Sequence, residues 1–342
     1  MTVRAVVYRG CRDVEVVGDF PEPTLSGARE AIVRVTKSAI CGTDLHPYRG
    51  EIPGFGTGTV LGHEFTGIVL AAGDLVPVRP GEAALASDLI ACGICSACAR
   101  AEHYQCARAS LFGYSTVVGE AVNGGQADLV KVPFADVLLT RRPDDVSEDA
   151  ALFASDTLAT AVAATQAARI GPGQSAVIVG AGTVGLLSAM CARLVGAARI
   201  VLSDPSPGRR MLAAELGFEA VKPEDLTGAC ERADSVIEAV GTDESLSDAI
   251  TVAGPRATVA VVGAHHGTTT SFPVGHAFAS ELTIAFVVGD PIRLRSQVIA
   301  LLRSGQLDPT AVISHRLSLD EAVRGYELFD QAIAAKVVLT TD

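Results

Sequence analysis

The chain has 342 residues, and at roughly 150 residues per domain this length suggests two domains, each with its own core. Apolar residues make up 49% of the sequence and charged residues 19%, a balance that is typical of globular proteins and argues against disorder. The formal net charge of −12 argues against a nucleic-acid partner, because proteins grip phosphate backbones with Lys and Arg.

The first half of the chain has the pattern of a β-domain. Up to about residue 150, short β-type runs alternate with Gly and Pro; examples are residues 31–36, 66–71 and 127–132. We expect a barrel or a sandwich. From Ser147 the pattern changes, and the Ala-rich stretch 149–168 has helical spacing without Pro or Gly. It predicts one long helix.

The second half alternates strands with helices. Residues 175–179 predict a strand, 184–195 a helix and 199–203 a second strand, and further strands are expected at 235–239, 258–262 and 282–288. This alternation favours a parallel sheet with helices on both faces. At the chain's end we expect a helix at 318–329 and a strand at 336–341.

One apolar segment needs weighing as a membrane span. Residues 170–192 are uncharged and long enough to cross a bilayer, but they contain Gly171-Pro172-Gly173 and several further glycines. Residues 1–10 lack the basic-then-apolar order of a secretion signal. We therefore expect a cytoplasmic protein with no membrane partner.

A glycine-rich motif predicts a dinucleotide site. Gly180, Gly182 and Gly185 form G-x-G-x-x-G between a predicted strand and a predicted helix. The first glycine permits the tight turn, the second lets the backbone approach a pyrophosphate, and the third allows close packing of helix on strand. Asp204 ends the next strand, where a carboxylate can accept hydrogen bonds from ribose hydroxyls. The cofactor-binding residues we expect are Gly180, Gly182, Thr183, Val184, Gly185, Asp204, Arg209 and Thr160.

The choice between NAD and NADP depends on a few side chains. Asp204 favours NAD, because its carboxylate would repel a 2′-phosphate. Arg209 and Arg210 keep NADP open as the less favoured alternative, since an arginine can hold that phosphate. Arg209 could instead cover the adenosine.

The cysteines point to metal. Four of the eight lie in one short window, at Cys92, Cys95, Cys98 and Cys106, and four thiolates on one loop suit a closed, structural zinc site. Three of the scattered cysteines, Cys11, Cys191 and Cys230, are interpreted as small buried hydrophobic residues.

A second, dispersed set could form an open zinc site. Cys41, His63 and Asp156 supply one thiolate, one imidazole and one carboxylate, which would leave a coordination position for substrate. Their spacing alone leaves ordinary core packing open as the alternative.

These motifs together resemble the zinc-dependent medium-chain dehydrogenase/reductase (alcohol dehydrogenase) family. CGTDLH at 41–46, GHE at 62–64, the four-cysteine lobe and the glycine motif with Asp204 carry the resemblance over essentially the full length. LFGY at 111–114, GQADLVKVPFA at 125–135 and HRLSLDEAVRGYELF at 315–329 are similar to the formaldehyde dehydrogenase-related branch.

The resemblance implies an α/β protein with two domains. Residues 1–153 and 291–342 would form a GroES-like β-barrel catalytic domain, with a zinc lobe at 91–107. Residues 154–290 would form a Rossmann domain, a doubly wound parallel sheet that binds NAD.

The resemblance also implies roles for individual residues. Cys41, His63 and Asp156 would hold catalytic zinc, and Glu64 would lie beside the metal and move in to displace substrate or water. Thr43 would take the substrate hydroxyl proton, and His46 would pass it towards solvent through the cofactor ribose. Thr160 would lie near the nicotinamide. Two Zn²⁺ per chain are expected.

The implied function is hydride transfer between an alcohol and NAD, or the reverse reaction with an aldehyde or ketone. Formaldehyde, itself or as a thiol adduct, is one substrate hypothesis. A polyol or secondary-alcohol dehydrogenase is the alternative within this class, and a noncatalytic zinc- and dinucleotide-binding redox sensor is the alternative outside it. We expect a homo-oligomer, favouring a tetramer over a dimer, joined through the edge strand 282–288.

Three departures from the family pattern have consequences. Ala101 stands where the family usually has Gly, which would strain that turn. The stretch 78–83 lacks the usual Gly-Asp-Arg-Val, so the barrel could differ locally. His265 and His266 are unusual after the fourth Rossmann strand; they either lie in an exposed loop or make a contact near the nicotinamide.

Overall fold

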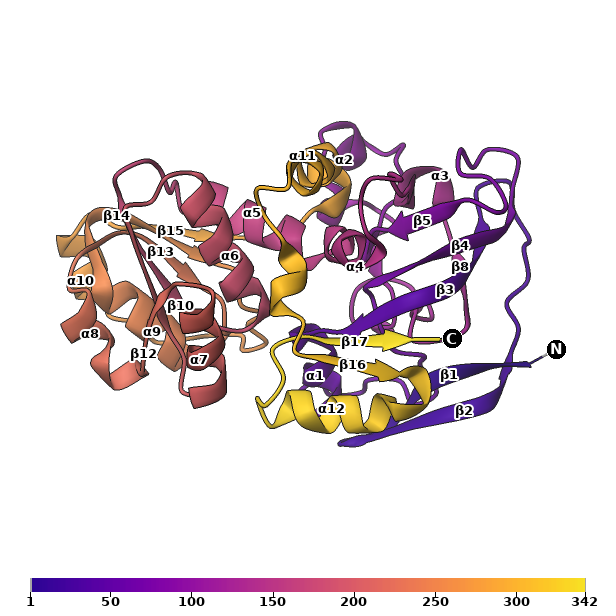
Figure 1. Cartoon of the computed structure of the whole chain (residues 1–342), viewed down its shortest axis with the longest axis horizontal. Coiled ribbons are helices and arrows are strands. Elements are labelled where there is room, and N and C mark those ends of the chain that lie inside the picture. Colours follow the sequence, from indigo (N-terminus) through magenta and orange to yellow (C-terminus); the bar gives the residue numbers. More distant parts are fainter. Residues whose placement is uncertain (1, 342) are drawn as a thin grey trace.

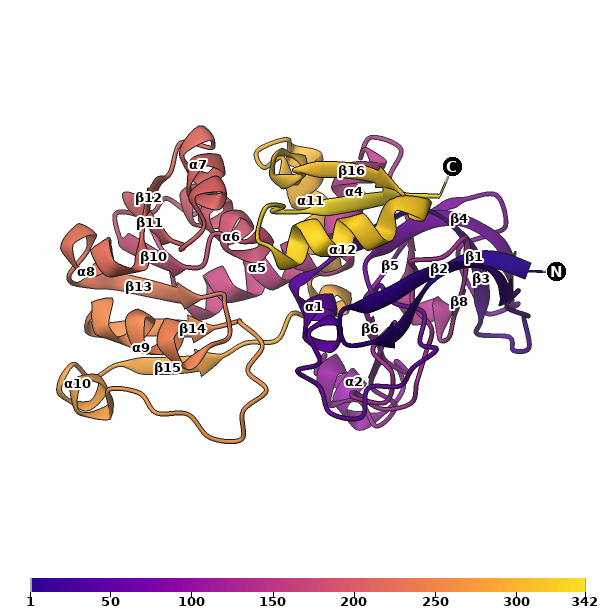
Figure 2. The same cartoon turned by 90° about the horizontal axis from the view of Figure 1, so that it is seen from below.

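The computed structural model describes residues 2–341, and the chain forms two halves that lie side by side (Figure 1). One half is built on a parallel sheet that has six strands in the described part. The other is built on a sheet of seven described strands, most of them antiparallel. Helices α5 (Thr157–Ala167) and α11 (Pro291–Ser304) lie where the halves meet (Figures 1 and 2). The expected combination of a GroES-like domain with a Rossmann-type parallel sheet is confirmed.

The parallel sheet has the strand order expected of a dinucleotide fold. Its strands are β10 (Ser175–Val179), β11 (Arg199–Ser203), β12 (Glu219–Val221), β13 (Ala233–Glu238), β14 (Ala253–Val261) and β15 (Thr283–Phe286). The spatial order β12-β11-β10-β13-β14-β15 reverses direction between β10 and β13, which makes the carboxyl end of β10 the topological switch point. The intervening helices are α6 (Thr183–Leu194), α7 (Pro207–Glu215), α8 (Leu226–Ala229), α9 (Asp243–Val252) and α10 (Val274–Ala279).

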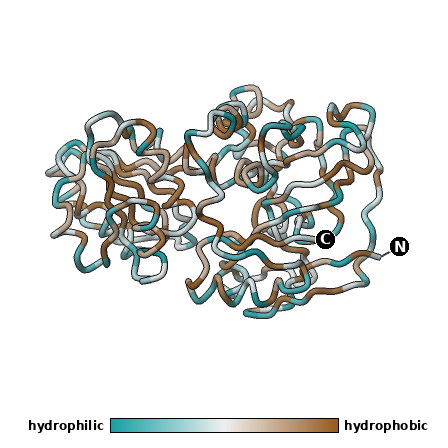
Figure 3. Tube along the Cα trace, viewed as in Figure 1, coloured by the Kyte–Doolittle hydropathy of each residue, from teal (hydrophilic) through white to brown (hydrophobic). Residues whose placement is uncertain are grey.

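Alternating residues of β10 belong to different core clusters. Ala176 and Ile178 pack with the cluster that contains α5 and α6, whereas Val177 and Val179 pack with the cluster that contains α9. Side chains of a strand point alternately to its two faces, so a run that is apolar throughout is buried on both. The brown segments in Figure 3 follow these central strands.

The second half combines both ends of the chain. Its large sheet contains β3 (Ala31–Ile40), β4 (Phe65–Ala72), β5 (Ala83–Ala86), β8 (Leu129–Val132), β9 (Leu139–Arg141), β16 (His315–Ser318) and β17 (Val337–Thr340). Strand β17 pairs antiparallel with β3, so the last residues of the chain complete a sheet begun by the first (Figure 1). The other elements are β1 (Thr2–Gly10), β2 (Asp13–Pro21), α1 (Gly42–Tyr48), α3 (Ala135–Leu138), α4 (Glu148–Leu152) and α12 (Ala322–Asp330).

The four cysteines lie in a small lobe that is tied to the junction of the halves. The lobe is bounded by β6 (Leu89–Ile90) and β7 (Ser110–Leu111), which pair with each other, and it contains α2 (Ser96–Ala99). Nδ1 of the buried His103 lies 3.0 Å from the Asp290 carboxylate. Because Asp290 also accepts a hydrogen bond from the Arg293 amide at the start of α11, it joins the lobe to that helix.

Several expectations from the sequence were wrong in detail. Residues 149–168 do not form one helix: α4 ends at Leu152, a 3-10 turn covers Phe153–Ser155, and α5 begins at Thr157. The backbone of Asp156 (φ −153°, ψ −76°) lies outside the helical region. Helix propensity sees only the local sequence, whereas this break turns the Asp156 carboxylate towards partners that are distant along the chain.

The shorter expectations had mixed outcomes. Strands 175–179 and 199–203 are confirmed, and the expected helix at 318–329 forms from Ala322 onward, after β16. Cys191 and Cys230 are buried as expected, but Cys11 is exposed, and its thiol donates a hydrogen bond to the Arg49 carbonyl. Among residues 2–341, no helix combines the length and the hydropathy that a membrane crossing requires.

The expected strain at Ala101 leads to a first prediction. Ala101 has φ +56°, in the left-handed region, which costs a residue with a Cβ roughly 1–2 kcal/mol. Ala101→Gly should therefore stabilise the zinc lobe by about 0.5–1 kcal/mol. This gain is smaller than the strain that is relieved, because glycine also raises the conformational entropy of the unfolded chain. The measurement is the denaturant midpoint of zinc release, followed with a chromogenic chelator. Ala99→Gly, in helix α2, is the matched control and should lower the midpoint; the same direction for both variants would contradict the strain.

Candidate active site with two metal clusters

The first metal cluster is the cysteine lobe. The Sγ atoms of Cys92 and Cys106 are 3.5 Å apart. The Sγ atom of Cys95 lies 3.6 Å from that of Cys98 and 3.8 Å from that of Cys106. These separations exclude disulfides, whose sulfurs are about 2.05 Å apart. They match the edges of roughly 3.8 Å of a tetrahedron with Zn–S bonds of about 2.3 Å. The donor set therefore fits one zinc ion with no open position.

The surroundings of Cys95 favour its thiolate. Backbone N–H groups of Cys98 and Ala107 donate to its sulfur and lower the pKa of Cys95 to about 6. A thiolate is the form that binds zinc. By contrast, burial together with hydrogen bonds to its neighbours Cys95 and Cys106 raises the pKa of Cys98 to about 12. That thiol therefore needs the cation to lose its proton.

The second cluster gathers side chains from three distant segments. Cys41 precedes α1, His63 follows the turn at Gly62, and Asp156 precedes α5. Oδ2 of Asp156 lies 3.8 Å from Cys41 Sγ and 3.5 Å from His63 Nε2. With bonds of about 2.0–2.3 Å, a tetrahedral zinc would place such donors roughly 3.4–3.6 Å apart. Donor atoms of Cys41, His63, Glu64 and Asp156 all lie within 4.8 Å of one another.

The buried donor atoms of this cluster also indicate a cation site. His63 Nε2 has no hydrogen-bond partner among residues 2–341, which is costly for a nitrogen in a side chain that is almost fully buried. Burial raises the pKa of the Cys41 thiol. Burial alone would lower the pKa of His63, but Asp44 and Asp156 raise it well above its usual range. Without a metal, protons would occupy these donors, and a divalent cation can replace them.

Further residues orient the donors. Asp44 Oδ1 lies 3.2 Å from His63 Nδ1, on the side of the ring opposite to Nε2, and Asp44 Oδ2 accepts from the Cys41 amide. The Thr160 hydroxyl, one helical turn after Asp156, donates to Asp156 Oδ1 over 2.8 Å. Carboxylates behind a ligating histidine are a usual part of metal sites because they fix the ring and its tautomer.

Glu64 is paired with a residue that the sequence did not single out. Glu64 and Lys336 are both fully buried, and the Lys336 ammonium donates to Glu64 Oε2. Burial opposes the charge on Lys336, but the Glu64 carboxylate raises its pKa. Lys336 directly precedes β17 and was interpreted only as the start of a strand. The sequence did contain a signal for a buried ion pair, because Lys336 is the single charged residue in the otherwise apolar run 334–339.

The residues expected to move a proton lie on the helix that follows Cys41. Thr43 and His46 are three positions apart on α1, which places them on one face of the helix. The His46 side chain is 16% exposed, and its Nδ1 lies 2.6 Å from Oε2 of Glu51. Its ring also meets that of His266, with centroids 4.2 Å apart. His266 is exposed, as expected for a residue in an exposed loop, but it also contacts His46 on α1.

The glycine motif lies at the switch point of the parallel sheet. Gly180 has φ +101°, and a Cβ on Gly185 would lie 1.8 Å from the Gly180 carbonyl oxygen, so both positions demand glycine. A Cβ on Gly182 would meet only the Arg209 guanidinium, at 3.8 Å. The space above Gly182 at the start of α6, bordered by Arg209, fits a pyrophosphate.

Asp204 is engaged with this loop in the structure. Its carboxylate accepts hydrogen bonds from the amides of Ala181 and Ser206, and Arg209 Nη1 lies 3.7 Å away. The Thr183 hydroxyl is directed elsewhere, because it donates to the Ala335 carbonyl over 2.6 Å. Val184 is half-buried on α6. The structure thus brings Asp204 and Arg209 to the motif and uses Thr183 to join the halves.

Comparisons with known proteins identify the family. The model described as "Alcohol dehydrogenase GroES-like domain" matches residues 27–142, and "Zinc-binding dehydrogenase" matches residues 183–304. The "Probable zinc-binding alcohol dehydrogenase" of Mycobacterium tuberculosis is 37% identical over 331 residues, which cover 95% of this chain and 84% of that protein. The chain belongs to the zinc-dependent medium-chain alcohol dehydrogenase family.

Solved structures agree. Alcohol dehydrogenase TADH from Thermus sp. ATN1 is 37% identical, with a TM-score of 0.91 over 98% of this chain and 99% of that one. Zinc-dependent alcohol dehydrogenase 2 from Streptococcus pneumonia is 27% identical, with a TM-score of 0.89 over 99% of each chain. This dehydrogenase is thus an oxidoreductase acting on CH–OH groups with NAD(P), and it has two zinc sites.

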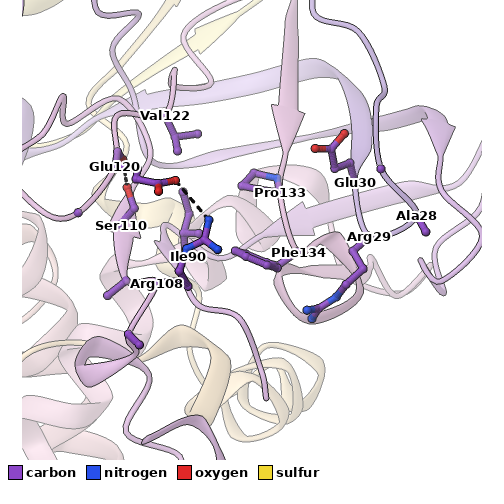
Figure 4. Close-up of a pocket in the computed structure, with 14 residues that line it drawn as sticks. Ala28, Arg29, Glu30, Ile90, Arg108, Ser110, Glu120, Val122, Pro133 and Phe134 are labelled. Carbon is purple, nitrogen blue, oxygen red and sulfur yellow. Dashed lines mark hydrogen bonds and ion pairs between the residues drawn. The ribbon is translucent and has the colours of Figure 1, made fainter. Parts of the chain in front are cut away.

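One cavity of this dehydrogenase is separate from the second metal cluster and is poorly suited to catalysis. It measures about 620 Å³ and opens beside the cysteine lobe, with Phe134 between Arg29 and Arg108 (Figure 4). Arg29 pairs with Asp136 and Arg108 with Glu120, so both guanidinium groups already have carboxylate partners. The residues of the second metal cluster do not line it.

Zinc content tests the two clusters. The wild-type dehydrogenase should contain two zinc ions per chain, and His63→Ala and Asp156→Ala should each contain one, because only the open cluster is broken. Elemental analysis of the purified variants gives the ratio. Cys191→Ser, at a buried cysteine outside both clusters, is the control and should retain two. Two ions in both His63→Ala and Asp156→Ala would show that these residues do not hold the metal.

Proposed function

We propose that this dehydrogenase oxidises an alcohol with NAD, with zinc held by Cys41, His63 and Asp156. The observation that carries the proposal is the buried cluster in which an unpartnered His63 nitrogen faces the Asp156 carboxylate beside the Cys41 sulfur. Three protein ligands leave a fourth position for the substrate oxygen. This arrangement argues against the noncatalytic redox-sensor alternative, which needs no open position.

The residues around the cluster can handle the proton. Bound zinc supplies Lewis acidity, and a bound nicotinamide accepts the hydride. Thr43 would receive the substrate hydroxyl proton, and His46, on the same face of α1, would pass it towards solvent. Glu64, held back by Lys336, lies close enough to the donors to approach the metal when substrate or water leaves. Thr160 would lie near the nicotinamide, and its hydroxyl holds Asp156.

NAD is the proposed cofactor. Asp204 lies against the glycine motif, and its negative charge would oppose a 2′-phosphate. Arg209 is only 3.7 Å from that carboxylate, so its charge is shared with Asp204. The residues proposed to bind NAD are Gly180, Gly182, Thr183, Val184, Gly185, Asp204, Arg209 and Thr160. Thr183 would act through its backbone, because its hydroxyl donates to the Ala335 carbonyl.

One observation favours the polyol alternative. Asp88 carries a carboxylate whose Oδ1 is buried without a hydrogen-bond partner among residues 2–341. The Asp88 amide donates to the carbonyl of Ser155, the residue before Asp156, so Asp88 lies next to the metal cluster. Burial, together with the charge of Asp156, raises the pKa of Asp88 well above its usual range. A substrate with a second hydroxyl would satisfy that oxygen. The likeness to the formaldehyde dehydrogenase-related branch stays a prediction.

A substrate panel tests the proposed function. NADH formation by the zinc-replete enzyme should be detected with at least one class among primary alcohols, secondary alcohols, polyols, and formaldehyde with or without a thiol. His63→Ala should lower the rate more than 100-fold because the metal is lost. Replacing NAD with NADP should lower kcat/KM. Rates on a diol that exceed those on the matching mono-alcohol would favour the polyol alternative; activity that survives in zinc-depleted His63→Ala would contradict the mechanism.

We also propose that the enzyme is a homotetramer joined through β15. No described strand pairs with the outer edge of β15, and two phenylalanines near it are exposed, Phe278 by 87% and Phe286 by 72%. A bare edge with apolar side chains is a template for pairing with another chain. The domain boundaries at residues 153/154 and 290/291 and the cytoplasmic location stay predictions.

Light scattering after size-exclusion chromatography tests the assembly. The wild type should elute as a tetramer of 35.2 kDa chains, and Phe286→Lys should give smaller species because it places a charge at the edge. Leu75→Lys is the control, because Leu75 is 62% exposed and belongs to the other half of the molecule. A monomeric wild type would contradict the proposal.

A further inference from the structure

The His46 ring is held by a carboxylate of its own half of the molecule. Nδ1 of His46 lies 2.6 Å from Glu51 Oε2, and the Glu51 amide donates to the His46 carbonyl over 2.9 Å. Gly50, with φ +76°, turns the chain back after α1. Both the backbone and the side chain of Glu51 are therefore fixed relative to His46.

This contact selects one tautomer of the ring. An ionised carboxylate can only accept hydrogen bonds, so the proton between the two groups belongs to Nδ1 of His46. Nε2 is left with its lone pair, which is the form that can accept a proton. Glu51 also offers a negative charge to the imidazolium that forms.

The His46 ring is also contacted by the dinucleotide half. His266 lies in the loop between β14 and α10, which reaches from that half towards the side where α1 lies (Figure 2). Its ring meets that of His46 edge to face, at 71° between the planes. Partial burial, with a smaller contribution from His46, lowers the pKa of His266 and so disfavours a second positive charge beside His46.

A buried carboxylate fixes the loop that carries His266. Glu238 at the end of β13 is fully buried and accepts hydrogen bonds from the amides of Val240 and Gly241 and from the Ser245 hydroxyl. Its second oxygen lies 3.4 Å from His265 Nε2. Because the His265 side chain is held in this way, the position of the next residue, His266, beside His46 is also restricted.

From these contacts we infer that Glu51 and His266 are positioning residues for proton transfer through His46. Glu51 sets the Nδ1–H tautomer, and His266 packs edge to face on the ring from the other half of the molecule, which limits the ring's rotation away from that carboxylate. The proton released by the alcohol binds at Nε2, the resulting imidazolium faces Glu51, and the proton then leaves to water. This inference rests on the proposed function, in which His46 carries the proton.

Isotope effects on the holoenzyme test the inference. Glu51→Leu should lower kcat/KM about 100-fold and Glu51→Gln about tenfold, because glutamine keeps an accepting oxygen without the charge. His266→Ala should lower it about tenfold, and His266→Phe, which keeps a ring, should restore most of the rate. In Glu51→Leu the solvent deuterium isotope effect should rise and the effect of deuterating the alcohol should fall, because proton transfer becomes limiting. A structural defect would lower the rate without raising the solvent isotope effect and lowering the substrate isotope effect together.

Controls separate this inference from the proposed function. Glu102→Leu, at an exposed glutamate of the cysteine lobe, should leave kcat/KM and both isotope effects unchanged. Full activity in His46→Ala would overturn the proton-relay part of the proposed function. Impaired His46→Ala with unimpaired Glu51→Leu and His266→Ala would overturn only the present inference.

Thermal unfolding gives a readout that needs neither substrate nor cofactor. In the cycle of His46→Ala, His266→Ala and the double variant, the changes in Tm should be non-additive, because the two rings touch. Additive changes would show that the contact between the halves does not form, and would overturn the role of His266.

Discussion

The buried ion pair between Lys336 and Glu64 is the interaction on which the active site depends. Both side chains are fully buried, and removing one partner of such a pair typically costs about 3–5 kcal/mol, since the other charge is left in a poor solvent for it. The pair can form only if the C-terminal segment returns to the sheet begun by the first half. The pairing of β17 with β3 provides this return.

The same segment connects the metal cluster with the cofactor loop. Ala335 accepts a hydrogen bond from Thr183 at the start of α6, and the next residue, Lys336, reaches Glu64 beside the metal cluster. Two neighbouring residues thus fix the glycine motif relative to the zinc ligands. Hydride transfer needs its donor and acceptor held close together, and a misplacement of about 1 Å can cost about 100-fold in rate. The contacts at 335–336 restrict such misplacement.

Much of the fold was predictable from local patterns, and the exceptions have physical causes. Strand β10, the glycine motif and the four-cysteine lobe follow from short-range rules of periodicity and spacing, so the sequence was sufficient for them. The helix break at Asp156 was missed because the Ala-rich segment around it has high helix propensity, and propensity carries no information about a distant thiol. Lys336 was missed because a charged residue in an apolar strand has meaning only when its partner is known. Asp88 and the contact of His266 are likewise tertiary features. Glu51 lies only five residues after His46, but the sequence does not show that the turn at Gly50 brings the two side chains together.

Each half of the molecule supplies a histidine held by a carboxylate, and the contact of His46 with His266 joins the two arrangements. Glu51 holds His46 on the catalytic side, while Glu238 holds His265 and so places His266. The carboxylates differ in burial, because Glu238 is fully buried whereas Glu51 is 41% exposed. A fully buried acid suits a permanent anchor, whereas the partly exposed Glu51 lies beside solvent. The half that carries the glycine motif therefore also contacts His46, so the surroundings of this histidine are complete only when both halves are present.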